Sequence, residues 1–178
     1  MRTSVRRIAR SCVAVAFAGV FALTTAAPAQ ADALDVTCTG TVSTTLSPGL
    51  TLTPQSITTT NNFVYNPCTS TDPNLSSGQY SLTFTAVFSC LSPMDSGSGT
   101  KRILWNTGQF SDFAFNSTTS TVGGQFVVVR TGVITGGQFQ GNTAVETTVG
   151  PSLDLLACAV PPGITSRSSV TTLEITSL

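Results

Sequence analysis

The amino-acid sequence predicts an all-β fold: an antiparallel two-sheet sandwich of about eight or nine short strands, of which an immunoglobulin-like domain is one form. Apolar and polar residues alternate in short segments, which places every second side chain on one face of a strand. Threonine and serine are abundant, and threonine fits the half-buried surface of a sheet. No segment keeps helical apolar spacing over more than two turns. A closed barrel is the alternative arrangement of the same strands.

The clearest strand is expected at residues 80–90. Its even positions carry aromatic, aliphatic or cysteine residues, whereas serine and threonine occupy most odd positions. The remaining strands are separated by turn signals, which include Ser47-Pro48-Gly49 and Gly136-Gly137. We expect these strands at 36–45, 50–60, 101–105, 109–115, 125–135, 139–149, 153–160 and 170–178.

Strand parity predicts which side chains face the core. In the hairpin around residues 106–108, with Gly108 left-handed, Arg102 and Asp112 oppose each other on the outer face. Glu146 is also expected on an outer face, because its neighbour Val145 is expected to point inward. The residues expected on the core face of the hairpin are Ile103, Trp105, Phe113 and Phe115.

Residues 1–31 have the pattern of a secretory signal peptide. Four arginines in the first ten positions precede an apolar run, and Ala29-Gln30-Ala31 forms a small-residue cleavage site. We expect cleavage before Asp32, with cleavage before Leu34 as the second choice. Since the apolar run is shorter than the ~20 residues that span a bilayer, the product is expected to be a secreted, extracellular single domain at 32–178 without a membrane anchor.

Four cysteines remain after the leader, and an even number in an exported chain favours two disulfides. Their spacing contains no C-x₂-C pair of the kind found in zinc sites. Three connectivities are open. Because strand counting places Cys38 and Cys68 at one end of the first hairpin, we favour Cys38–Cys68 and Cys90–Cys158.

Three stretches resemble small exported four-cysteine all-β proteins of actinomycetes, a group without an assigned activity. They are residues 34–40, 47–54 and 150–158. The resemblance implies export and the four-cysteine frame, and it assigns a function to no residue.

Charge and composition narrow the chemistry. Residues 32–178 hold four basic and eight acidic residues, a net charge of −4, so a nucleic-acid partner is not expected. The absence of histidine removes Ser-His and Cys-His nucleophiles and imidazole metal sites. Ser98 and Lys101 match S-x-x-K, but they lie at a glycine-serine loop instead of on a helix. We expect no catalytic residue, no metal and no cofactor. Two less favoured hypotheses are an acid pair that hydrolyses glycosides and a calcium ion bound by aspartates in turns.

Residues 61–77 form the longest irregular stretch expected, and a disulfide would brace it. Loops of this kind on rigid sandwiches often bind ligands. We therefore take Phe63, Tyr65, Asn66 and Asp72 as candidate binding residues. The competing interpretation is that the two rings only cap the core.

These observations favour a secreted, non-enzymatic binding module whose partner is another secreted protein in an extracellular assembly or an extracellular glycan. Binding would use the 61–77 loop or an open sheet edge. The alternatives are a protease inhibitor that presents the braced loop and a small glycoside hydrolase with two carboxylates.

Overall fold

The computed structural model describes residues 33–92 and 96–177. They belong to a compact unit that spans Ala31–Leu178. The predicted leader at 1–31, its cleavage before Asp32 and the acidic residue Asp95 lie outside the described residues. Within the described part, no helix has the length and apolar character needed to cross a membrane.

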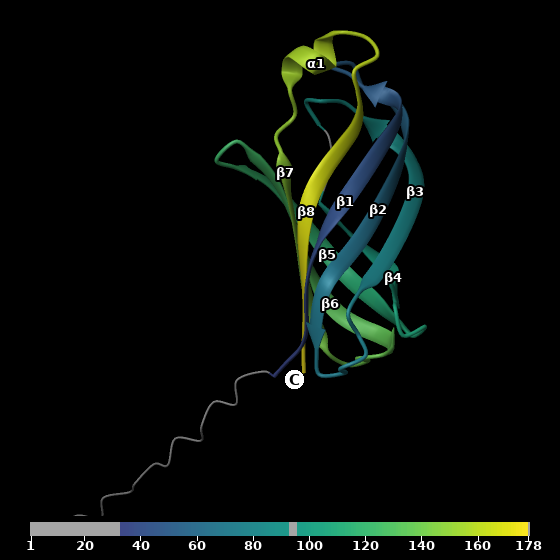
Figure 1. Ribbon diagram of the computed structural model, residues 1–178. Coiled ribbons are helices and arrows are strands. Elements are labelled where there is room, and N and C mark those ends of the chain that lie inside the picture. Colours follow the sequence, from purple (N-terminus) through teal and green to yellow (C-terminus); the bar gives the residue numbers. More distant parts are fainter. Residues whose placement is uncertain (1–32, 93–95, 178) are drawn as a thin grey trace, which may run out of the picture. The chain divides into compact units, whose positions relative to one another are not determined.

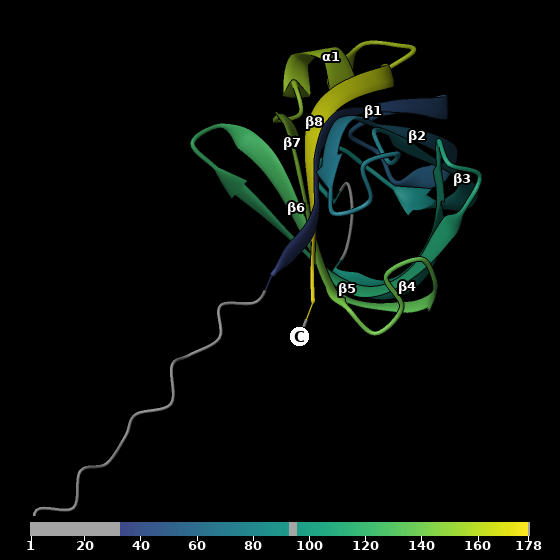
Figure 2. The same cartoon turned by 60° about the horizontal axis from the view of Figure 1, so that its bottom comes forward.

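Eight antiparallel strands form a closed barrel (Figures 1 and 2), in which each strand pairs with the next and the last returns to the first. The all-β prediction is confirmed. The strands do not separate into two sheets, however, because the long first strand pairs along most of its length with both the second and the eighth. In chain order the elements are β1 (Leu34–Leu50), β2 (Gln55–Ser70), β3 (Gly78–Phe88), β4 (Gly97–Trp105), β5 (Phe110–Val122), β6 (Gln125–Gly137), β7 (Thr143–Pro151), α1 (Leu155–Ala159) and β8 (Ile164–Thr176).

Several segments differ from the sequence prediction. The turn expected at Ser47-Pro48-Gly49 lies inside β1, and the one expected at Gly136-Gly137 lies at the end of β6. The strand expected at 153–160 is the helix α1, which lies at one end of the barrel (Figure 1). It begins there because the Asp154 carboxylate accepts hydrogen bonds from the backbone N–H groups of Leu156 and Ala157. The loop expected at 61–77 is present only at 71–77, since β2 continues to Ser70 and pairs with β1 and β3.

The hairpin between β4 and β5 forms as predicted. Gly108 has a φ of 81°, in the left-handed region that glycine adopts without a steric cost. Arg102 and Asp112 make a two-bonded ion pair on the outer face, with both N···O distances at 2.8 Å. Trp105 is buried, and its indole N–H donates to Ser111 Oγ at 2.9 Å.

Both predicted disulfides are present. Cys38–Cys68 joins β1 to β2, and Cys90–Cys158 joins the segment after β3 to α1. The second bond lies at the α1 end of the barrel, because β3 ends there opposite the start of β2. It therefore braces the end of the barrel at which the connections between strands are longest.

The wall of the barrel is weakest between β3 and β4. These strands pair only at Gly78–Trp105 and Gln79–Leu104, whereas β2 and β3 pair along residues 55–65 of β2. Within the described part, the remainder of β3 and of β4 has no strand partner on this side. We refer to this opening as the β3–β4 seam.

Buried apolar residues form two clusters inside the barrel. The larger fills the half that holds both described chain ends, and it includes Val42, Phe63 and Trp105. The smaller fills the α1 end and includes Leu46, Leu50 and both cysteines of the Cys90–Cys158 bond. The two clusters do not merge, and a cavity lies between them.

Candidate functional site in the barrel interior

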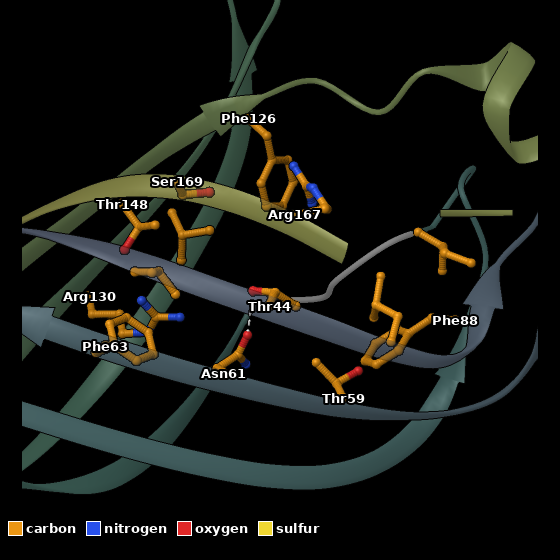
Figure 3. A pocket seen from close by; sticks show the side chains of 14 residues that line it. Thr44, Thr59, Asn61, Phe63, Phe88, Phe126, Arg130, Thr148, Arg167 and Ser169 are labelled. Atoms are coloured by element: carbon orange, nitrogen blue, oxygen red, sulfur yellow. Dashed lines mark hydrogen bonds between the residues drawn. The ribbon is translucent and has the colours of Figure 1, made fainter. Parts of the chain in front are cut away.

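The cavity between the two clusters has a volume of about 70 Å³. Its lining includes Val42 and Phe63 from one cluster and Leu46 and Leu50 from the other. The side chains that face it come from β1, β2, β3, β6, β7 and β8 (Figure 3). The polar or charged members of the lining are Thr44, Thr59, Asn61, Arg130, Thr148, Arg167 and Ser169.

A buried charged group lies next to the cavity. Glu146 of β7 accepts hydrogen bonds at one carboxylate oxygen from Lys101 Nζ and from the Tyr65 hydroxyl. Its other oxygen accepts from Arg130 Nη1 at 2.7 Å. Lys101 Nζ also donates to the Tyr65 hydroxyl at 2.9 Å. We call these four residues the interior charge cluster; of them, only Arg130 lines the cavity.

Aromatic rings surround the ammonium group of Lys101. Its Nζ atom lies 4.8 Å from the ring centroid of Phe63. Four more rings, those of Tyr65, Tyr80, Phe113 and Phe115, lie between 5.5 and 5.9 Å. The faces of aromatic rings attract cations, so this cage holds a charge that has been removed from water.

Burial sets the electrostatics of the cluster. It lowers the pKa of Lys101 to about 8, although Glu146 acts in the opposite direction. Burial alone would raise the pKa of Glu146, but the charges of Lys101 and Arg130 and the hydrogen bonds that Glu146 accepts hold it below its usual value. Burial and Glu146 raise the pKa of Tyr65 well above its usual value. At neutral pH the cluster therefore contains two cations, one carboxylate and a neutral phenol.

Arg167 is a second cation on the cavity wall. Its guanidinium lies 5.2 Å from the ring centroid of Phe126, as Figure 3 shows, and one nitrogen donates to the Pro151 carbonyl at 2.7 Å. Partial burial lowers its pKa. No carboxylate lines the cavity, so Arg167 has no acidic partner there.

Some polar groups of the cavity lining have no hydrogen-bond partner among the described residues and could bind a ligand. Thr44 donates to Asn61 Oδ1 at 2.7 Å, which leaves the Asn61 amide nitrogen without a partner among the described residues. Thr59 is 2% exposed, and its hydroxyl oxygen has no partner in the described part. A buried hydroxyl without a partner is unfavourable, so the Thr59 hydroxyl is available to a polar group in the cavity.

The predicted binding residues do not form one site. Phe63 and Tyr65 face the barrel interior and are 5% and 0% exposed. Asn66 is exposed on the outside, and Asp72 lies in the connection after β2, where it accepts from Gln138 Nε2 at 3.0 Å. The surface loop that was expected to present the two rings is absent, and both rings instead pack around Lys101.

The inward position of Glu146 is the largest difference from the sequence prediction. Glu146 is fully buried, whereas Val145 is 41% exposed, the reverse of the expected orientation. The three partners of Glu146 come from β2, β4 and β6, and nothing within its own strand indicates them. Ser98 and Lys101 lie on opposite faces of β4, exposed and buried respectively, so the S-x-x-K match does not form a reactive pair.

Sequence reasoning also missed Arg130 and Arg167 as interior residues. The usable signal was the alternation of side chains: Phe126, Val128 and Arg130 share one face of β6. Three successive valines at 127–129 hide this alternation in the sequence. Among the described residues, no group of three His, Cys, Asp or Glu side chains is placed to hold a metal ion.

Comparison of this chain with protein-family models, curated proteins and solved structures finds no match. The resemblance to exported actinomycete proteins therefore stays a prediction. The functional argument depends on the geometry of the barrel interior.

Proposed function

We propose that this chain is a secreted, non-enzymatic binding protein that holds a small, partly apolar molecule inside its barrel. The single observation that carries the proposal is the cavity between the two core clusters. The hydroxyl of Thr59 lines this cavity and has no hydrogen-bond partner among the described residues. Mouths and interiors of β-barrels are common ligand sites.

The proposal of binding without catalysis is supported by the interior side chains. Among the described residues, Glu146 is the only carboxylate that faces the interior, and it is fully engaged. A glycosidase needs a second carboxylate roughly 5–10 Å away. Lys101 is mainly an ammonium at neutral pH, because its pKa of about 8 is above 7.

The size of the cavity limits the ligand. An apolar cavity of about 150 Å³ accommodates benzene. The 70 Å³ of this partly open cavity therefore holds only part of a six-carbon chain, and the remainder extends through the opening. Short alcohols and acids are therefore suitable probes.

Calorimetric titration with hexan-1-ol tests the proposal. We expect saturable binding of one molecule per chain. Ser169→Leu fills the cavity from β8 and should abolish this binding, whereas Ser168→Leu places the same side chain on the exposed face of the same strand and should preserve it. Equal affinity in both variants would place the ligand outside the barrel and refute the proposal.

The β3–β4 seam favours a second function: strand addition by a secreted protein partner. Unpaired edges of β3 and β4 present backbone groups that another chain can bind. A lysine on an edge strand opposes such pairing. In pull-downs from culture filtrate, Val87→Lys on β3 should lose a bound protein that the wild type retains, whereas Val170→Lys on the fully paired β8 should not. Identical recovery with both variants would argue against strand addition.

Surface glycan binding and protease inhibition have no comparable support. Glycan binding would use exposed rings, and both Phe63 and Tyr65 are buried. Protease inhibition would use a braced loop at 61–77, and residues up to Ser70 are instead part of strand β2.

A further inference from the structure

The charge distribution inside the barrel specifies the chemistry of the ligand. We infer that the molecule held in the cavity carries an anionic group, a carboxylate or a similar small oxyanion, which binds at Arg130. This inference deepens, and depends on, the proposed interior binding function.

The buried charges inside the barrel do not balance. The interior charge cluster combines two cations, Lys101 and Arg130, with the single carboxylate of Glu146, which leaves one uncompensated positive charge. Burying an unpaired charge is costly, and an anion in the cavity would balance it. Arg167 adds a second positive charge to the wall, and no carboxylate lines the cavity.

Basic and acidic residues are also distributed unequally between the inside and the outside of the barrel. The described part of the chain contains four basic residues, and Arg102 alone lies on the outer face, paired with Asp112. Lys101, Arg130 and Arg167 face the interior, whereas all described acidic residues except Glu146 lie outside the barrel interior. A domain with net negative charge thus has a positive interior, which favours an anionic guest.

Arg130 has hydrogen-bond donors that remain free. Only one of its nitrogens has a partner among the described residues, the Glu146 oxygen at 2.7 Å. Arginine has five N–H donors in a planar arrangement that matches carboxylate geometry. In Figure 3, Thr148 lies on the same side of the cavity as Arg130. Its hydroxyl is hydrogen-bonded to that of Thr171 at 3.2 Å, so Arg130 is the main source of free donors at this end.

The cavity also has a direction. Phe88 lies at the other end of the view in Figure 3, and it packs against the cluster that contains Leu46 and Leu50. An amphipathic acid would therefore place its charged group deep in the barrel at Arg130 and its apolar part toward the α1 end.

The test compares hexanoate with hexan-1-ol, which differ mainly in the charged group. Wild-type protein should bind hexanoate at least about tenfold more tightly than hexan-1-ol, equivalent to about 1.4 kcal/mol. Arg130→Gln removes the proposed contact, and Lys101→Met removes the excess charge at a residue that does not line the cavity. Both variants should reduce the ratio of the hexanoate affinity to the hexan-1-ol affinity to near unity.

Arg102→Gln is the matched control, because it removes one positive charge from the outer face of the same strand as Lys101. It should keep the preference for hexanoate. If Arg130→Gln does not fold, as judged by circular dichroism, Lys101→Met decides the outcome.

The outcomes separate this inference from the proposed function. The inference of an anionic ligand is refuted if the wild type binds hexan-1-ol as tightly as hexanoate, or if the folded variants keep the preference for hexanoate. Either result leaves the proposal of interior binding intact. Failure of the wild-type protein to bind either probe counts against the proposed function itself.

Discussion

Glu146 shows how one side chain organises the barrel interior. Its carboxylate accepts from Lys101, Tyr65 and Arg130, which come from three other strands. Buried ion pairs often add little net stability, but removing one partner leaves an uncompensated charge and costs about 3–5 kcal/mol. The cluster therefore makes the arrangement of these strands specific.

Substitutions in the cluster should differ by the charge that they leave behind. Glu146→Gln leaves two buried cations without an anion and should lower the free energy of unfolding by about 3–5 kcal/mol. Lys101→Met leaves the neutral Arg130–Glu146 pair and fills the aromatic cage with an apolar side chain, so we expect a loss of roughly 1–2 kcal/mol. Urea denaturation followed by tryptophan fluorescence measures both values. A larger loss for Lys101→Met would contradict this account of the cluster.

The lowered pKa of Glu146 predicts instability in acid. Because folding lowers this pKa from its usual value of 4.5, the stabilisation is complete above pH 4.5 and is lost as the pH falls through the lower pKa of the folded state. The urea concentration at the unfolding midpoint, measured from pH 7 to pH 3, should decrease once the pH is below 4.5. In Glu146→Gln that part of the decline should be absent, and an identical decline in the variant would show that other carboxylates cause it.

The sequence predicted which aromatic side chains face inward, but it did not predict the inward position of the charged side chains. Tyr80 and Trp105 were predicted to face inward from strand parity, and both lie against the barrel interior. In β7, the same reasoning oriented the strand by Val145 and so placed Glu146 outside. A lone inward carboxylate is unfavourable unless partners distant in the chain neutralise it, and Lys101 lies 45 residues away.

At the scale of elements, the sequence predicted those turns and strands whose conformation depends on residues close together in the chain. The β4–β5 hairpin formed around Gly108 because a left-handed residue was needed there. Helix α1 was missed although Asp154 is a typical N-cap residue, since the apolar segment of five residues that follows it has no helical period. The extent of β2 was missed because Asn61, Asn62, Asn66 and Pro67 are typical of loops.

Close packing of neighbouring strands gives a prediction for glycine. A Cβ atom at Gly132 of β6 would lie 1.9 Å from the Ala114 carbonyl oxygen, whereas one at Gly97 of β4 would meet nothing within 4 Å. Gly132→Ala must therefore displace backbone, and we expect it to cost at least about 3 kcal/mol. Gly97→Ala should change the free energy of unfolding by less than about 0.5 kcal/mol. Similar urea midpoints for the two variants would contradict the pairing of β5 with β6.

At the scale of the whole molecule, the closure of the barrel was beyond local sequence reasoning. Closure requires β1 to pair with β8, for example Val36 with Ile175, and no local pattern couples segments so far apart. Alternation gives each strand an inner and an outer face in a sandwich and in a barrel alike. The difference lies in which edges meet, and that is set by the full set of strand pairings.

The two disulfides should differ in their effect on binding. Replacing Cys90 and Cys158 by alanine should cost about 2–4 kcal/mol of stability and also weaken hexan-1-ol binding, because these cysteines pack against Leu46 and Leu50 of the cavity wall. Replacing Cys38 and Cys68 should cost a similar amount of stability. Because this bond lies beyond the Val42–Phe63 pair of the cavity wall, toward the end of the barrel opposite α1, the second replacement should leave the affinity unchanged. Equal losses of affinity in the two double variants would show that the cavity depends on global stability alone.

The β3–β4 seam should be the place where the barrel opens. Strands that pair on both sides hold their amides in two ladders, whereas β3 beyond Gln79 and β4 before Leu104 are each held on one side in the described part. Local opening there breaks few hydrogen bonds, so its free-energy cost is well below that of global unfolding. Hydrogen exchange followed by mass spectrometry should show about half of the amides in residues 81–88 and 97–103 exchanging at least about tenfold faster than those of 36–45 and 171–175. Hexanoate should slow exchange at the seam only if the ligand passes through it, and protection confined to the α1 end would identify that end as the route. Uniform exchange across all eight strands would show that the seam is no weaker than the rest of the wall.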